Sequence, residues 1–586
     1  MSYSLQSTER IGEGLISDES QRQRYVSFSC YDYLLVSKRP MDNSPLAASI
    51  HILNDDCLLN IFFLYRPFLL GEDGDEDDRL TGGEWDRGHW WYELAHVCQR
   101  WRNVILGAAS YLGISLVCTR GTPVADMLEH SPPLPLDIDY QGDDITAEDE
   151  EIAILALKQY NRARRVRLGM LVANLQNVIV AMDDEYPVLE YLIITNSGED
   201  EQEDESSICQ FPETLQAPHL RHLMLIGPFA LPIGSRLLTT AIGLVTFCLG
   251  MVRPSTYFHP NVLLRWLSFM PQLETLFVLF SFPASNRDVG RLLTHTPITT
   301  PITLPNLHHF KFRGVRTYLE TLVLRIITPR LGKLQIVFFN QLTFSVPGLV
   351  QFVNETENLM FKSAKFKFVD EKVEVEVYPH EDAETYALSI GVQCLHFDWQ
   401  ISSAAQILNS LSPAFSAVEH LTLEHDIHSR SSEEHNEADH TEWRRLLSSF
   451  RNVKTLRIAE GLVGELSRCL ERDNKELPLG LLPELQELTY FGSDDTGDVF
   501  TSFADARLDV GRPLTLVRRG PSPDQGSSVP SLEPASIPPA SDEAGSDLDT
   551  DNRVVNPSPA LAPSPTSSHL LHRDVLAEDL ATPKIP

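Results

Sequence analysis

The phrase "PHLRHLML" (218–225) sets Leu220, Leu223 and Leu225 in the order apolar–x–x–apolar–x–apolar behind a proline. The last two leucines lie two positions apart, as side chains on one face of a strand do. The first leucine is expected to turn inward just before that strand. The phrase therefore predicts a short strand that buries Leu223 and Leu225 and leaves His222 on the other face.

The same phrase recurs along the chain, with leading residues 24–35 positions apart except for one gap of 61. We expect the gap to hide one degenerate copy near "ENLMFKSAKFKF" (357–368). The other copies have these apolar triplets: Leu189, Leu192, Ile194; Leu244, Phe247, Leu249; Leu273, Leu276, Val278; Leu307, Phe310, Phe312; Leu331, Leu334, Ile336; Val392, Leu395, Phe397; Val418, Leu421, Leu423; Val453, Leu456, Ile458; and Leu485, Leu488, Tyr490.

Helix-like segments such as 261–270 and 441–450 lie between the copies. Strands that alternate with helices indicate an α/β fold with parallel strands and helices outside. The rhythm is that of a leucine-rich repeat, so residues 119–515 are expected to form an irregular leucine-rich-repeat solenoid. Unrelated βα units in an ordinary doubly wound sheet are the alternative.

A compact helical unit is expected over residues 45–118. Asn54 can cap a helix whose first turn holds Asp55 and Asp56, where the helix dipole favours acids. An acidic insert at 71–88 separates this helix from a second one that starts near Trp90. Apolar residues then recur at helical spacing, and an apolar piece at 108–117 closes the unit. They are Cys57, Leu58, Ile61, Phe62 and Tyr65 in the first helix and Leu94, Val97, Cys98, Trp101, Val104 and Ile105 in the second.

The order "LNDDCLLNIF" (53–62), "LAHVCQRWR" (94–102) and "YLGISL" (111–116) resembles an F-box. It is similar to the F-box-like proteins with irregular leucine-rich repeats that mushroom-type fungi carry, in which a strand–helix–strand like 118–140 opens the repeat domain. This resemblance implies a non-catalytic substrate-receptor subunit of a Skp–cullin–F-box ubiquitin ligase. The chain departs from the family at Leu53-Asn54, where Leu-Pro is common, and in the length of the insert between the two helices.

A three-helix unit of this size cannot cover all its apolar side chains by itself, so another chain is expected to cover some. The resemblance makes that chain a Skp-type adaptor, which bridges to cullin. Packing within the chain alone is the alternative, since helical spacing does not separate a core face from an interface. The expected adaptor-facing residues are Leu53, Leu58, Ile61, Phe62, Val97, Cys98 and Trp101.

A protein substrate is expected to contact the outward residues of the predicted strands. A scaffold that keeps the F-box-like fold but recruits no ligase is the alternative function. The outward candidates are Glu190, Tyr191, Arg221, His222, His308, His309, Lys454 and Thr455.

The net charge of −33 is concentrated in acidic segments, which we interpret as solvated loops and a tail. The segments 71–88, 143–151 and 199–205 are the acidic loops. A near-neutral body with acidic loops argues against nucleic-acid binding, which needs a basic footprint. Common nucleotide-binding, hydrolase and metalloprotease motifs are missing, so we expect no catalysis and no cofactor.

Five histidines lie among acids at His420, His425, His428, His435 and His440. Their spacing matches no established ligand set, so no metal site is expected.

Eight cysteines without any Cys-x-x-Cys pair are typical of reduced thiols in an intracellular protein, cytoplasmic or nuclear. The start of the chain lacks the pattern of a secretory signal. The apolar run 237–252 is short for a membrane span and contains one of the repeat phrases.

The two ends of the chain carry little pattern. Residues 1–44 are weakly patterned, and the Pro-, Ser- and acid-rich residues 516–586 are expected to be disordered. Within them, 569–580 is a candidate for a short helix that forms on binding.

Overall fold

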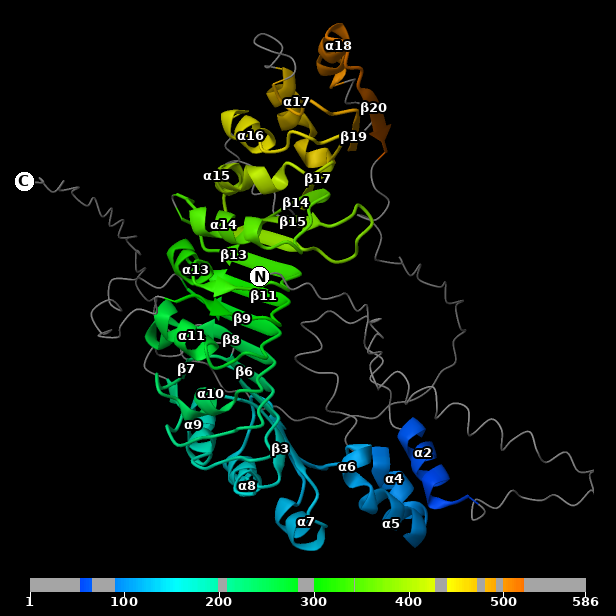
Figure 1. The fold of residues 1–586 in the computed structure, drawn as a ribbon, viewed down its shortest axis with the longest axis vertical. Helices are drawn as coiled ribbons and strands as arrows, with labels where there is room; N and C mark the ends of the chain where they lie inside the picture. The colour runs from blue at the N-terminus through cyan, green and yellow to red at the C-terminus, as the bar shows by residue number, and fades with distance from the viewer. Residues whose placement is uncertain are drawn as a thin grey trace, which may run out of the picture. The chain divides into compact units, whose positions relative to one another are not determined.

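The computed structural model describes residues 53–65, 90–198, 208–282, 300–341, 343–426, 440–471, 480–491 and 499–520. Its fold is mixed α/β, with a large, mostly parallel sheet and helices packed beside it (Figure 1). The expected α/β class is therefore confirmed. The insert 71–88, the acidic segment 199–205, His428 and His435, and the segments 1–44 and 521–586 lie outside the described residues.

The helical unit at the front consists of α2 (Asp55–Tyr65), α4 (Trp90–Val97), α5 (Gln99–Gly107) and α6 (Ala109–Leu112). The predicted cap is confirmed, because the Cys57 backbone N–H donates to Asn54 Oδ1 at 2.7 Å. The prediction of one continuous second helix was wrong. Cys98 is extended, with φ −163° and ψ 166°, so the chain turns between α4 and α5, and Val97 and Trp101 do not share one helical stripe.

Strand order in the large sheet is β1-β2-β3-β4-β6-β8-β9-β11-β13-β16-β15-β14-β17-β18-β19-β20. Short pairs β5 with β7 and β10 with β12 lie apart from it. Up to β13 the strands are β1 (Leu116–Thr119), β2 (Leu136–Gln141), β3 (Ala163–Met170), β4 (Tyr191–Asn196), β5 (Cys209–Gln210), β6 (His222–Ile226), β7 (Phe229–Ala230), β8 (Thr246–Val252), β9 (Thr275–Phe280), β10 (Ile302–Thr303), β11 (His309–Gly314), β12 (Ile326–Ile327) and β13 (Lys333–Phe338).

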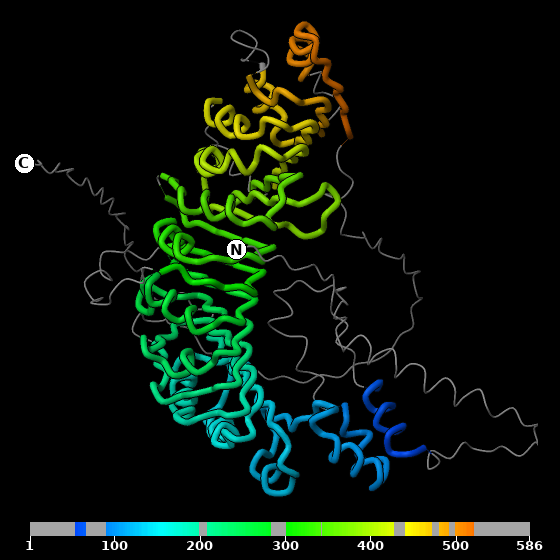
Figure 2. Tube along the Cα trace, viewed as in Figure 1, coloured from blue at the N-terminus to red at the C-terminus, as the bar shows by residue number. Residues whose placement is uncertain are grey.

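Helices follow most of these strands (Figure 2). They are α7 (Val124–His130), α8 (Ala147–Leu157), α9 (Val172–Val180), α10 (Arg236–Thr240), the 3-10 helix η3 (Pro254–Thr256), α11 (Pro260–Leu267), α13 (Arg316–Val323) and α14 (Pro347–Glu355). Among them, α7 contacts α8, α8 contacts α9, α11 contacts α13, and α13 contacts α14.

The succession of parallel neighbours is interrupted after β13. The hairpin of β14 (Ser363–Val369) and β15 (Lys372–Tyr378) pairs antiparallel, and β15 also pairs antiparallel with β16 (Leu388–Gln393). Parallel pairing resumes from β14 to β17. The remaining elements are α15 (Phe397–Phe415), β17 (His420–Asp426), α16 (His440–Leu447), β18 (Thr455–Ile458), η4 (Glu460–Leu462), α17 (Val463–Glu471), β19 (Glu487–Phe491), α18 (Thr501–Asp509) and β20 (Thr515–Arg519).

Nine of the ten repeat phrases form strands with their apolar triplets buried, as predicted. The prediction of a strand with a buried apolar triplet at 392–397 was wrong. The strand there, β16, starts earlier, Leu395 is 71% exposed, and Phe397 begins α15. The degenerate copy does form β14, but inside the antiparallel hairpin. Because of this hairpin, the structure shows a large, mostly parallel sheet and not the expected solenoid of successive repeats.

Two smaller expectations change as well. The acidic run 143–151 is not a loop throughout, because it supplies the first turn of α8, where Thr146 and Asp149 form a capping box. The predicted tail begins too early, since β20 continues to Arg519. In the described part of the chain, no helix has the length and apolar character to cross a membrane, and the run 237–252 divides between α10 and β8.

Candidate partner-binding surfaces

The helical unit has its own small core, built from one face of α2. Leu58 and Phe62 lie one helical turn apart and are fully buried. The Phe62 ring packs edge-to-face on the Trp101 indole of α5, with ring centroids 4.9 Å apart. Leu58 and Phe62 were predicted to face the adaptor, and this was wrong, because α5 already covers them.

A second face of α2 is apolar but exposed. Ile61 is 44% exposed, and Leu64 and Tyr65, three and four positions further on, are also exposed. Val97 at the end of α4 is 57% exposed. We call Ile61, Leu64, Tyr65 and Val97 the exposed apolar set.

The other predicted adaptor-facing residues are intermediate. Leu53, Cys98 and Trp101 are each half-buried, so part of each side chain is accessible. Phe63 and Tyr111 extend the exposed apolar surface beyond the predicted residues, with ring centroids 5.4 Å apart. The uninterrupted run of apolar residues at 61–65 was the sequence signal for this additional exposed surface, and the prediction did not use it.

Arg100 holds α5 against the start of α2. Its guanidinium donates to Asp55 Oδ1 at 2.7 Å and to the Leu53 carbonyl oxygen at 2.6 Å. The acid in the first turn of α2 therefore also links α2 to α5.

A polar chain joins the helical unit to the first strands. The Trp91 indole N–H donates to the Ser115 carbonyl oxygen at 3.3 Å, and the Ser115 hydroxyl donates to Asp137 Oδ2 at 2.5 Å. Burial raises the pKa of the Asp137 carboxyl. These contacts tie α4 to β1 and β2.

The sheet face opposite the helix-covered core is called the outer face. Across β3, β4, β6 and β8, the aligned residues Arg165, Tyr191, His222 and Thr246 form one row. The Tyr191 and His222 rings stack at 4.3 Å, Arg165 lies over the Tyr191 ring at 4.7 Å, and His222 Nδ1 lies 3.1 Å from Thr246 Oγ1. The row is cationic and aromatic.

The next row on the outer face is apolar. Ile193, Met224, Cys248 and Phe277 occupy aligned positions on β4, β6, β8 and β9 and form a small hydrophobic cluster separate from the main core. Lys311 on β11 follows in the same row, with Nζ 5.6 Å from the Phe277 ring centroid.

Acidic residues are missing from the front strands, by which we mean β3, β4, β6, β8, β9, β11 and β13. The back strands, β14 to β19, differ, since they carry Glu374, Glu376, Glu424, Asp426 and Glu487. The two parts of the outer face therefore have different electrostatic character.

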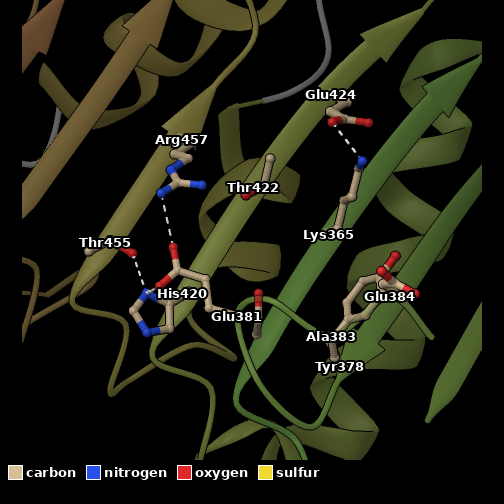
Figure 3. Close-up of a pocket in the computed structure, with 11 residues that line it drawn as sticks. Lys365, Tyr378, Glu381, Ala383, Glu384, His420, Thr422, Glu424, Thr455 and Arg457 are labelled. Atoms are coloured by element: carbon tan, nitrogen blue, oxygen red, sulfur yellow. Dashed lines mark hydrogen bonds and ion pairs between the residues drawn. The ribbon is translucent and has the colours of Figure 1, made fainter. Parts of the chain in front are cut away.

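A polar pocket of about 290 Å³ lies on the back strands (Figure 3). Two ion pairs flank it, Lys365 with Glu424 at 2.8 Å and Arg457 with Glu381 at 2.9 Å. His420 Nδ1 lies 2.8 Å from Thr455 Oγ1. Glu384 also belongs to the lining, so the pocket mixes cations with a larger number of carboxylates.

The predicted substrate-facing residues fall into two groups. At the strand starts, Glu190 accepts from Arg164 at 2.9 Å, His308 lies 3.8 Å from Glu274, and Lys454 pairs with Glu419 at 2.7 Å. Arg221 is exposed and Tyr191, His222 and Thr455 are half-buried on the outer face, as expected. His309 was predicted to be accessible but is buried, and its ring packs edge-to-face on Phe277.

Two groups on the sheet have displaced pKa values. Burial, with the nearby cations Arg221 and Arg165, lowers the pKa of His222 to about 4. Hydrogen bonds from Lys454 and Lys362 lower the pKa of Glu419 to about 2. His222 is therefore neutral at physiological pH and Glu419 is ionised.

Comparison with known proteins does not identify the chain. No protein-family model matches the sequence, and no curated protein matches it either. Within the described ranges, no group of three or more His, Cys, Asp or Glu side chains is placed to hold a metal ion.

Proposed function

We propose that this chain is the substrate-receptor subunit of a Skp–cullin–F-box ubiquitin ligase. Residues 45–118 would act as an F-box-like domain that binds the Skp-type adaptor. The strand–helix units of 119–515 would act as irregular leucine-rich-repeat-like units that hold a protein substrate. The subunit itself would catalyse no step, since the transfer belongs to the enzymes that the scaffold recruits.

The observation that carries this proposal is the second apolar face of α2. A surface helix normally buries its apolar residues against the core and exposes polar ones. Here α5 covers the face of Leu58 and Phe62, while Ile61, Leu64 and Tyr65 stay exposed. Clustered exposed apolar side chains mark a surface that binds another protein. The resemblance of 53–62 and 94–102 to an F-box supports the adaptor as that protein.

The outer face of the front strands supports a substrate with acidic and apolar side chains. These strands contribute basic residues and no acid, and the aspartates of the adjoining β2, Asp137 and Asp139, lie opposite only two of them; the basic residues are Arg165, Arg167, Lys311, Arg313 and Lys333. Complementary charge across an interface raises the association rate and selects the partner. An acidic protein segment with apolar residues would meet both the basic positions and the apolar row.

Co-purification tests the adaptor contact. The tagged full chain is expected to capture adaptor and cullin, and the double variant Ile61→Arg with Leu64→Arg should capture at least about tenfold less, because two charges would enter an apolar interface. Leu508→Arg is the matched control, since Leu508 is as exposed as Leu64, at 60% each, but lies in α18. The control should capture as much adaptor as the unaltered chain.

Two results would count against the proposal. If the unaltered chain captures no adaptor, the alternative of a scaffold that recruits no ligase is favoured. If the double variant captures as much adaptor as Leu508→Arg, the exposed apolar set is not the contact. Circular dichroism of both variants shows that the comparison concerns folded protein.

A further inference from the structure

A cavity of about 510 Å³ lies where β6 and β8 end, a place that neither proposed surface uses. Ligand pockets commonly have volumes of about 300–1,000 Å³. Apolar and aromatic residues supply most of the wall, with few polar groups among them. The wall includes Phe229, Ile233, Val252, Tyr257, Phe258 and Trp266.

The wall is held in place before any ligand arrives. The Trp266 indole N–H donates to the Ile233 carbonyl oxygen at 3.2 Å, which joins α11 to the segment after β7. Phe258 packs on Trp266 with ring centroids 5.3 Å apart and also contacts Phe280 and Tyr318. A wall that is fixed in this way loses little conformational entropy on binding.

The backbone around the cavity has an unusual conformation. The register of β8 against β9 shifts between Leu249 and Val252, and within this bulge Met251 has φ 51°. Positive φ is unfavourable for a side chain such as methionine, and such strain concentrates where ligands bind. The bulge directs Val252 into the wall of the cavity.

Gly227, which belongs to the cavity wall, has no space for a side chain. Its φ is 144°, and a Cβ built there would lie 2.9 Å from Asn196 Cβ. Any other residue at this position would therefore collide with the neighbouring strand.

His259 belongs to the cavity wall and has a ring nitrogen that can donate a hydrogen bond. Its Nδ1 accepts from the Asn261 backbone N–H at 3.1 Å, capping α11. Burial lowers the pKa of His259, which favours the neutral ring. With Nδ1 used as an acceptor, the single proton of the neutral ring is on Nε2.

We propose that this cavity binds an uncharged, mainly apolar small molecule that has a ring system and one carbonyl-type acceptor. The aromatic wall would contact the rings, and His259 Nε2–H would donate to the acceptor. No charged residue belongs to the cavity wall, so a charged ligand would lose its hydration without compensation. The inference does not depend on the proposed ligase function.

Equilibrium dialysis of the full chain with 2-acetylnaphthalene and with 2-ethylnaphthalene tests the site. The two probes have the same rings and differ in the carbonyl. We expect the ketone to bind more tightly, and His259→Ser to weaken ketone binding roughly tenfold while leaving the hydrocarbon within twofold. Serine keeps the helix cap, so this variant removes the donor and preserves α11.

A second variant tests the location. Ser255 is exposed at the cavity edge, and Ser255→Trp should weaken both probes at least tenfold by occupying the space. Ser448→Trp, at an exposed position after α16, is the matched control and should leave binding unchanged. The proposal is overturned if neither probe binds, if both tryptophan variants behave alike, or if His259→Ser weakens the two probes equally.

Discussion

The front and back strands of the sheet share one ladder of hydrogen bonds but present different chemistry on the outer face. The front strands are parallel throughout and carry basic, aromatic and small apolar side chains. The back strands start with an antiparallel hairpin whose lysines and glutamates pair with one another, as Lys367 does with Glu376 at 2.7 Å.

This difference separates two uses of charge. In the hairpin, Lys365 and Lys367 pair with Glu424 and Glu376 on neighbouring strands, and Glu374 accepts from Lys372 on its own strand and from the buried Ser389 hydroxyl. Those pairs stabilise the sheet and leave little charge with which a ligand could interact. The front strands themselves contain basic residues and no acid, although Glu190 pairs with Arg164 at a strand start and Asp137 and Asp139 of β2 lie opposite Arg165 and Arg167.

The largest expected effect concerns the end of the back strands. The buried Arg507 guanidinium donates to the carbonyl oxygens of Leu482, Pro483 and Leu485 at 2.8–3.1 Å. Arg507→Ala should lower the free energy of unfolding by about 4 kcal/mol, because three carbonyls lose a charged donor. Urea denaturation combined with hydrogen exchange of β19 would measure this loss.

Arg512→Ala is the control for that measurement. Arg512 also donates to Pro483 and pairs with Glu484, but it is exposed, so its removal should cost less than about 1 kcal/mol. Equal losses for the two variants would mean that burial of Arg507 does not matter.

The front strands should instead be sensitive to added volume. A Cβ on Gly314 would lie 2.8 Å from Phe312 Cζ and 2.9 Å from Phe280 Cδ2. Gly314→Ala should therefore cost about 2 kcal/mol through overpacking of the aromatic cluster. Gly332→Ala, with no atom within 4 Å of its Cβ, should not be destabilising on steric grounds, and thermal unfolding of the pair tests the contrast.

Acid should destabilise the front strands before the back strands. His222 has a lowered pKa, so its contribution is complete above its ordinary pKa of 6.5 and is lost as pH falls toward about 4. We expect a loss on the order of 2 kcal/mol in that window. His222→Phe keeps a ring against Tyr191 and should remove this part of the pH dependence of unfolding.

Glu419 supplies the comparison for the back strands. Its lowered pKa means that its contribution is complete above its ordinary pKa of 4.5 and is lost as pH falls toward about 2. Hydrogen exchange measured at pH 7, 5 and 4 should therefore show the front strands losing protection first. The reverse order would contradict the assignment of His222.

The smallest expected effect tests the charge difference itself and rests on the proposed function. Lys311→Glu on the front strands should weaken capture of an acidic substrate about tenfold. Lys365→Glu on the back strands, whose partner is Glu424, should change capture less than twofold. Substrates identified by proximity labelling provide the readout, and equal effects of the two reversals would remove the distinction between the two parts of the sheet.

Local pattern predicted most of the strands, because one rule determined them. The rule is that apolar side chains of the phrase are buried in the core while the residues between them face outward. In the phrase at 218–225, the strand β6 follows this rule. The phrase at 392–397 fulfils the same rule on paper. There, the strand pairs with β13 and β15 and ends at Gln393, and Phe397 becomes the first residue of α15. Residues distant in sequence determine this outcome, so the local pattern could not predict it.

The candidate surfaces were harder to predict for a related reason. Helical spacing placed Phe62 and Ile61 together in one set, but α5 buries the first and leaves the second exposed. The extended Cys98 that divides α4 from α5 has no Gly or Pro beside it to signal a break. The cavity beside β8 lies at a bulge around Met251, and the isolated Gly250 next to it was a weak local signal of that bulge.

The position of β16 has a mechanical consequence. A chain pulled from its C-terminal end would lose β20, β19, β18 and β17 one after another, because each is an edge strand once the previous one has left. The next strand along the chain, β16, lies between β13 and β15, so its extraction must break two ladders at once. Under load the molecule should unfold in small steps from its C-terminal end. It should then resist unfolding at this interior strand, so the front strands should stay folded at forces that remove the back strands.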